Sequence, residues 1–290
     1  MSSGEPGAGV ARPGTARAAG DPRPVGMFDS GVGGLSVLSA VRRELPTEDV
    51  IYVADSGHAP YGDRSREFIE ARALAIVRFL ADQGVKAVVV ACNTATGAAV
   101  QAVRERVTMP VVAMEPAVKP AALQTKTGVV GVLATTSTLG SRRFLDLVDR
   151  HGAGVQVLIQ PCPGLVEQVE SGALGTAATR ALVERLVRPV LEKGADTLVL
   201  GCTHYPFLRP LIAEVAGPEV TVIDPAHAVA RELRRRLEAG GLLAPDSRRG
   251  REQFWTSGDP SRVGDVIRQL WPGSIPVLAL PPRVGTVAVP

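Results

Sequence analysis

The sequence is poor in lysine, cysteine and aromatic residues, and two of these shortages exclude classes of function. Only four lysines occur among its 290 residues, and none lies beside a motif that could carry chemistry. A pyridoxal phosphate enzyme needs such a lysine to hold its cofactor. The three cysteines, Cys92, Cys162 and Cys202, are an odd number in a long chain, which argues against a disulfide framework and for a reducing compartment.

Strong charge of one sign and long apolar runs are also missing. The net charge is only +3 and the arginines are scattered, so the sequence does not predict nucleic-acid binding. No run is long and apolar enough to span a bilayer, and residues 1–24 lack the hydrophobic centre of a signal peptide. We therefore expect a cytoplasmic protein with no membrane or nucleic-acid partner.

Two stretches of the chain share one pattern. Residues 84–94 and 194–204 each start at a Gly that ends a helix-like run, continue as an apolar segment and place a Cys eight residues after the Gly. Such runs are typical of buried parallel strands, and ligands bind just beyond the carboxyl ends of these strands. A free Cys is commonly a core residue. Two in matching frames instead predict that Cys92 and Cys202 lie at the rim of one crevice.

Strand and helix patterns alternate from residue 24 onward, which predicts βαβ units and parallel sheets. Val25 and Val130 open similar segments 105 positions apart, and Cys92 and Cys202 lie 110 positions apart, so the pattern indicates an internal duplication. We predict an α/β fold with two pseudo-symmetric lobes, each a mostly parallel sheet flanked by helices, and an active site in the cleft between them.

The predicted boundaries follow from this pattern. Lobe 1 comprises residues 24–117 and 224–280, and lobe 2 comprises residues 118–223. Residues 1–23 read as a disordered extension because they are rich in Gly, Ala, Pro and Arg without an apolar period. Residues 281–290 read as a loose tail.

Two thiols across a cleft suit a reaction that removes a proton from one face of a carbon and returns one to the other face. Asp29, at the end of the first strand, could accept the proton of Cys92 or hold a substrate ammonium, and His204 could do the corresponding work beside Cys202. Neutral donors for a substrate carboxylate come from Ser30, Asn93, Thr94 and Thr203 and from helix N-termini. Helix capping is the other interpretation of Asp29, Ser30, Thr94 and Thr203.

Four motifs in order carry a family resemblance: residues 28–37, 55–62, 91–95 and 201–206. Together they resemble the glutamate racemases of the cofactor-independent aspartate/glutamate racemase superfamily, over residues 25–280. The resemblance implies interconversion of L- and D-glutamate, which supplies D-glutamate for bacterial peptidoglycan, without cofactor or metal. We also expect a homodimer.

The same resemblance implies roles for individual residues. Cys92 is the base toward D-glutamate and Cys202 the base toward L-glutamate, with Asp29 and His204 assisting. The implied substrate contacts are Asp29, Ser30, Pro60, Tyr61, Gly62, Cys92, Asn93, Thr94, Thr135, Thr138, Glu170, Thr203 and His204. Apart from the resemblance, Glu170 reads as an exposed helix residue. Cys162 has no counterpart in the first half of the chain and reads as structural.

Several alternatives stay open from the residues. A dinucleotide site at residues 31–36 has Ser36 in place of the third glycine and would put Asp29 beside a pyrophosphate. A thiol hydrolase built on Cys202 and His204 leaves Cys92 without a role, and these two residues as metal ligands lack a second pair. A two-lobed receptor needs no thiols. Aspartate and hydantoin racemases are also possible, although the Pro60–Gly62 loop favours glutamate.

Overall fold

The structure is a computed structural model that describes residues 20–152, 154–246, 249–273 and 276–285. Its strands form two sheets, and every pair of neighbouring strands is parallel. The predicted α/β class, with two parallel sheets flanked by helices, is therefore confirmed. No described helix combines the length and the apolar character needed to cross a bilayer.

The first sheet has six strands in the order β10-β9-β2-β1-β3-β4. They are β1 (Val25–Asp29), β2 (Val50–Ala54), β3 (Ala87–Val90), β4 (Val111–Ala113), β9 (Glu252–Thr256) and β10 (Val277–Ala279). Side chains alternate between its faces, as expected for strands. Met27 packs in the same core as α1 (Leu35–Glu44) and α10 (Ala226–Ala239), whereas Phe28 packs with α2 (Arg66–Asp82) and α3 (Asn93–Arg106).

The second sheet has four strands in the order β6-β5-β7-β8, namely β5 (Val129–Ala134), β6 (Gln156–Pro161), β7 (Thr197–Leu200) and β8 (Thr221–Ile223). One face packs against α4 (Val118–Gln124), α5 (Thr136–Leu139) and α6 (Arg142–His151). The other packs against α7 (Leu165–Glu170), α8 (Ala177–Leu191) and α9 (Arg209–Ala216). Its strand order repeats the order β2-β1-β3-β4 of the first sheet, as the duplicated sequence pattern predicts.

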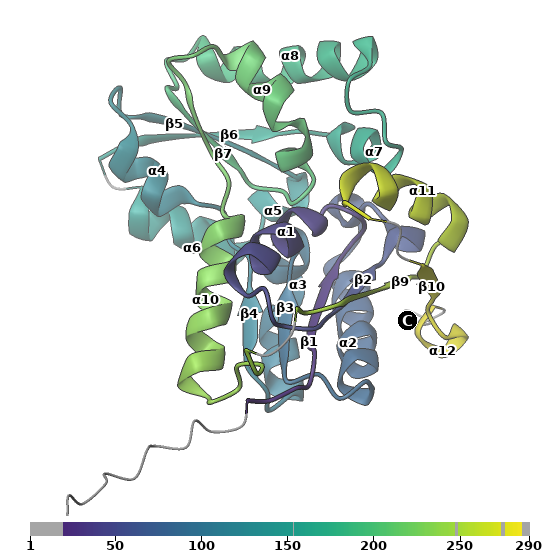
Figure 1. Cartoon of the computed structure of the whole chain (residues 1–290). Helices are drawn as coiled ribbons and strands as arrows, with labels where there is room; N and C mark the ends of the chain where they lie inside the picture. Colours follow the sequence, from purple (N-terminus) through teal and green to yellow (C-terminus); the bar gives the residue numbers. More distant parts are fainter. Residues whose placement is uncertain (1–19, 153, 247–248, 274–275, 286–290) are drawn as a thin grey trace, which may run out of the picture.

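The chain crosses between the sheets twice, from β4 to α4 and from β8 to α10, and Figure 1 shows the second sheet with its helices above the first. The remaining elements are α11 (Pro260–Leu270), α12 (Pro282–Gly285) and the 3-10 helices η1 (Ser56–His58), η2 (Tyr61–Asp63) and η3 (Tyr205–Leu208).

Two predicted segments differ from the structure. Residues 282–285 of the tail predicted to be loose form α12, where Val284 is buried, and residues 286–290 lie outside the described residues. Within the predicted extension, residues 1–19 lie outside the described residues, but Asp21 N donates to Leu243 O and ties residues 20–23 to the fold.

A buried ion pair links α12, through Arg72 of α2, to the residue that follows β2. Arg72 on α2 donates from Nε and Nη2 to the Asp55 carboxylate at 2.9 and 2.7 Å, and from Nη1 to Val284 O at 2.5 Å. Both charged side chains are fully buried. Burial raises the pKa of Asp55, but hydrogen bonds from His58 and Arg72 and the charge of Arg72 outweigh it, so the net shift is downward.

Arg72→Met should lower the free energy of unfolding by about 3–5 kcal/mol, because it leaves the Asp55 carboxylate buried without its cation. Urea unfolding followed by circular dichroism measures the change. Arg283→Met is the control, since its ion pair with Asp82 spans 3.7 Å on the exposed surface and should contribute less than about 1 kcal/mol. Equal losses in the two variants would contradict the role assigned to Arg72.

Candidate active site

The carboxyl ends of strands from both sheets meet at one small cavity. Cys92 follows β3 of the first sheet by two residues, and Cys202 follows β7 of the second sheet by two residues. The cavity is lined by Ser30, Pro60, Tyr61, Gly62, Cys92, Asn93, Thr94, Thr135, Val166, Cys202, Thr203 and His204. Its volume is about 10 Å³, which is room for about one water molecule.

Cys92 starts helix α3 and lies in an environment that favours the protonated thiol. Its Sγ accepts from Ala95 N at 3.4 Å, and its thiol faces Ser30 Oγ at 3.8 Å. Burial raises the pKa of the Cys92 thiol well above its ordinary value, and the charge of Asp29 raises it further. Cys92 is therefore better prepared to donate a proton than to accept one.

Asp29 lies behind the cavity wall, fully buried. Its Oδ2 accepts from Gly34 N at 2.8 Å, and Thr203 Oγ1 lies 3.3 Å from Oδ1. Burial raises the pKa of Asp29 above its ordinary value, and the opposing effect of the charge on His204 is smaller. The carboxylate thus contacts Thr203, a lining residue from the other sheet.

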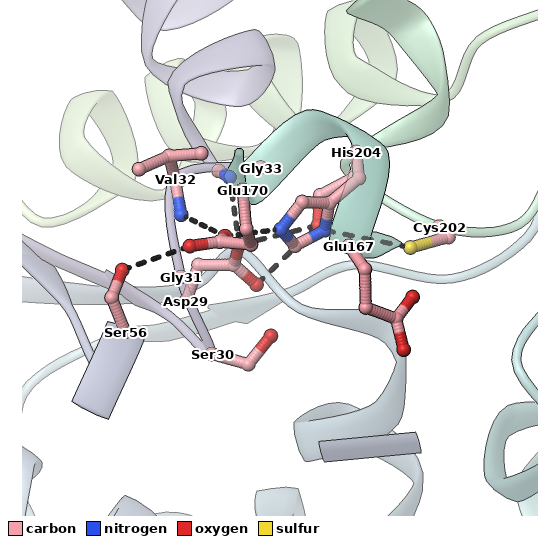
Figure 2. Close-up of polar contacts among 12 residues, drawn as sticks. Asp29, Ser30, Gly31, Val32, Gly33, Ser56, Glu167, Glu170, Cys202 and His204 are labelled. Carbon is pink, nitrogen blue, oxygen red and sulfur yellow. Dashed lines mark hydrogen bonds and ion pairs between the residues drawn. The ribbon is translucent and has the colours of Figure 1, made fainter. Parts of the chain in front are cut away.

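Cys202, His204 and Glu170 form a hydrogen-bonded chain, drawn in Figure 2. Cys202 Sγ lies 3.7 Å from His204 Nδ1, and His204 Nε2 lies 2.6 Å from Glu170 Oε1. Burial lowers the pKa of His204, but hydrogen bonds to Cys202 and Glu170 outweigh it, so the pKa lies well above the ordinary value of 6.5. The raised pKa favours the protonated ring, so a positive charge beside the Cys202 sulfur is favoured.

The glycine-rich loop between β1 and α1 leaves space for this chain. A Cβ on Gly31 would lie 1.9 Å from Glu170 Oε1, and a Cβ on Gly33 would lie 2.3 Å from His204 Nδ1. Neither glycine has a positive φ, so clearance and not backbone conformation requires them. Val32 N in the same loop donates to Glu170 Oε1 at 2.6 Å. His204 and Glu170 therefore pack against this loop. Their packing explains why the loop has glycines, so a dinucleotide site is not needed to explain them.

Three threonine hydroxyls join the two halves on another side of the cavity. Thr94 Oγ1, at the start of α3, lies 2.9 Å from Thr135 Oγ1 and 3.0 Å from Thr138 Oγ1. Thr135 and Thr138 are themselves 2.9 Å apart. The Tyr61 hydroxyl donates to Asp55, and the Ala59–Pro60 peptide bond is cis.

The structure brings all the sequence-predicted site residues to this region. Eleven of them line the cavity, and the other three, Asp29, Thr138 and Glu170, contact lining residues from behind. Glu170, which apart from the family resemblance reads as exposed, has a side chain that is only 18% exposed. Cys162 is buried but does not line the cavity, and its thiol donates to Gln160 O at 3.3 Å.

Sequence reasoning missed Val166, Val32 and Ser56. Val166 lines the cavity from the short helix α7, which has no sequence period to reveal it. Ser56 Oγ donates to Glu170 Oε2 at 3.1 Å. A sequence signal for Ser56 was available, because Ser56 follows Asp55 at the end of β2 as Ser30 follows Asp29 at the end of β1.

Over the described residues, no group of three His, Cys, Asp or Glu side chains is arranged to hold a metal ion.

Comparison with known proteins agrees with this geometry. The chain is 57% identical over 262 residues to a glutamate racemase from Methylococcus capsulatus, which covers 90% of this chain and 97% of that one. A crystal structure of a glutamate racemase isoform from Bacillus anthracis matches with a TM-score of 0.82 and 35% identity, covering 90% of this chain and 98% of that one.

A second solved structure, Escherichia coli glutamate racemase in complex with L-glutamate and the activator UDP-MurNAc-ala, matches with a TM-score of 0.78 and 33% identity. It covers 89% of this chain and 98% of that one. Residues 34–233 match the family described as Asp/Glu/Hydantoin racemase. The predicted resemblance and the prediction of a racemase, an isomerase, are thereby confirmed, and the chain belongs to the Asp/Glu/Hydantoin racemase family.

Proposed function

We propose that the chain interconverts L- and D-glutamate by proton transfer at Cα between two cysteines. The observation that carries the proposal is that Cys92 and Cys202, one from each sheet, line the same cavity. The names of the relatives support glutamate as the substrate. The lobes proposed for this chemistry are residues 24–117 with 224–280, and residues 118–223, and each would contain one of the two sheets.

In the L-to-D direction, the Cys202 thiolate removes the Cα proton of L-glutamate while the His204 imidazolium stabilises that thiolate. The electron pair of the C–H bond stays on Cα as a carbanion. The Cys92 thiol then donates its proton to the opposite face, which yields D-glutamate and a Cys92 thiolate. The reverse direction uses the same steps with the two sulfurs exchanged, and Asp29 assists Cys92.

We infer that neutral donors bind the substrate, because no lysine or arginine is among the described residues that line the cavity. Asn93 is buried and lines the cavity, and neither its side-chain oxygen nor its nitrogen has a hydrogen-bond partner among the described residues. Such a group is costly unless a ligand pairs with it. Asn93, with Ser30, Thr94 and Thr203, is therefore suited to a substrate carboxylate, and Asp29 to the ammonium.

Entry of glutamate requires movement, because a cavity of about 10 Å³ cannot hold it. The two chain crossings, β4 to α4 and β8 to α10, are the natural points about which the sheets could separate. A role in supplying D-glutamate for peptidoglycan follows from the family resemblance, and a cytoplasmic location follows from the sequence features given above. These two and a homodimer stay predictions.

In deuterium oxide, the protein should incorporate deuterium at Cα of glutamate without added cofactor, as measured by proton NMR, and aspartate should exchange far more slowly.

Cys92→Ser and Cys202→Ser should each lower kcat by about a hundredfold to ten-thousandfold, because each removes a proton-transfer group. Cys162→Ser, which alters the third buried cysteine, is the control and should keep near-normal turnover. Full turnover in Cys92→Ser would contradict the role of Cys92 in proton transfer.

Glu170→Gln should shift the alkaline limb of the kcat/KM profile to lower pH. Because hydrogen bonds to Cys202 and Glu170 raise the pKa of His204, the imidazolium persists above pH 6.5 and is lost only as the pH rises through the raised value. Removing the carboxylate lowers that value. Glu167→Gln, an exposed glutamate one helical turn earlier, should leave the limb in place. An unmoved limb in Glu170→Gln would argue that His204 does not titrate there.

A further inference from the structure

Ser56 lies outside the cavity lining but contacts the chain of groups behind Cys202. It begins η1 at the end of β2, on the first sheet, whereas Glu170 ends α7 beside the second sheet. Its Oγ donates to Glu170 Oε2 at 3.1 Å across a separation of 114 residues, and Figure 2 shows the two side chains pointing toward each other.

The two oxygens of Glu170 have different partners. Oε1 accepts from Val32 N at 2.6 Å and faces His204 Nε2 at 2.6 Å. Oε2 accepts from the Ser56 hydroxyl. A carboxylate held through one oxygen alone can rotate about its Cγ–Cδ bond, but one held through both cannot do so without breaking a hydrogen bond. Ser56 therefore fixes the plane of the carboxylate that orients the His204 ring.

We propose that Ser56 is a positioning residue for racemisation, acting through Glu170 and His204 on Cys202. This inference rests on the proposed function. It assigns Ser56 to one of the two proton transfers only, because no contact links Ser56 to Cys92 among the hydrogen bonds of the described residues. Ser56 follows a strand of the first sheet, so a residue of the first sheet would then help to position the groups around Cys202 of the second sheet.

Three variants test this role. Ser56→Ala removes the hydroxyl, and Ser56→Thr keeps it. Ser257→Ala is the matched control, because Ser257 Oγ accepts from Gly57 N at 3.1 Å and supports the same loop without a contact to Glu170. Ser56→Ala should lower kcat/KM by about tenfold, the usual effect of losing a hydrogen bond to a charged group. Ser56→Thr should restore most of it, and Ser257→Ala should leave it close to wild type.

Isotope effects separate positioning from a general structural loss. Enantiomers have equal free energies, so kcat/KM must fall equally in both directions. With glutamate deuterated at Cα, however, Ser56→Ala should raise the primary isotope effect for L-glutamate, whose deuteron goes to Cys202, and lower it for D-glutamate, whose deuteron goes to Cys92. Wild-type isotope effects in Ser56→Ala, or equal changes for both enantiomers, would overturn the inference.

A second readout is independent of turnover, so failure of the proposed function is recognised separately. If wild-type protein does not racemise glutamate, the proposed function fails, while alkylation by iodoacetamide still reports on Cys202. In the folded, ligand-free protein, peptide mass spectrometry gives the ratio of Cys202 to Cys92 alkylation. Ser56→Ala should lower this ratio severalfold, with Ser257→Ala unchanged. An unaltered ratio in Ser56→Ala would refute the positioning role.

Discussion

The ion pair of His204 and Glu170 is the contact on which the rest of the site depends. A buried imidazolium is costly unless a partner compensates it, and here the partner lies 2.6 Å away. Glu170 in turn needs donors, and the loop between β1 and α1 supplies one through Val32 N. The absence of a Cβ at Gly31 and Gly33 is what lets these side chains reach the loop. The Glu170 carboxylate, beside the second sheet, is thus stabilised by the backbone N–H of Val32, which follows β1 of the first sheet.

The duplicated fold delivers two thiols to equivalent strand ends, but their surroundings are unlike. Cys92 starts the 14-residue helix α3 and lies near Asp29, where burial and a negative charge raise the pKa of its thiol. Cys202 is followed by the short helix η3 and faces His204, whose raised pKa favours a positive charge. Two similar groups in environments of opposite charge can serve as acid and base at one pH. Symmetry positions the sulfurs, and local charge distinguishes them.

Local patterns made much of this predictable from sequence. Apolar runs followed by Cys92 and Cys202 identify strands and their ends, since both features are contiguous in the chain. The contacts of Ser56 and Val32 with Glu170 join segments more than a hundred residues apart, so no local pattern encodes them. Helix α7 has only six residues, too few for a period. The order in residues 282–285 comes from Arg72 bonding Val284 O, which is likewise a long-range contact.

The proposed function links substrate entry to the contacts of Glu170. If glutamate is the substrate, as proposed, it cannot enter a cavity of about 10 Å³ without movement. Glu170 accepts from Val32 and Ser56 on the first sheet and faces His204 on the second. Glu170 therefore carries the contacts of the first sheet to His204, and closure over the substrate would expel water around them. In the proposed mechanism, a carbanion at Cα would thus form only where water is excluded and Cys202 is supported by its full set of partners.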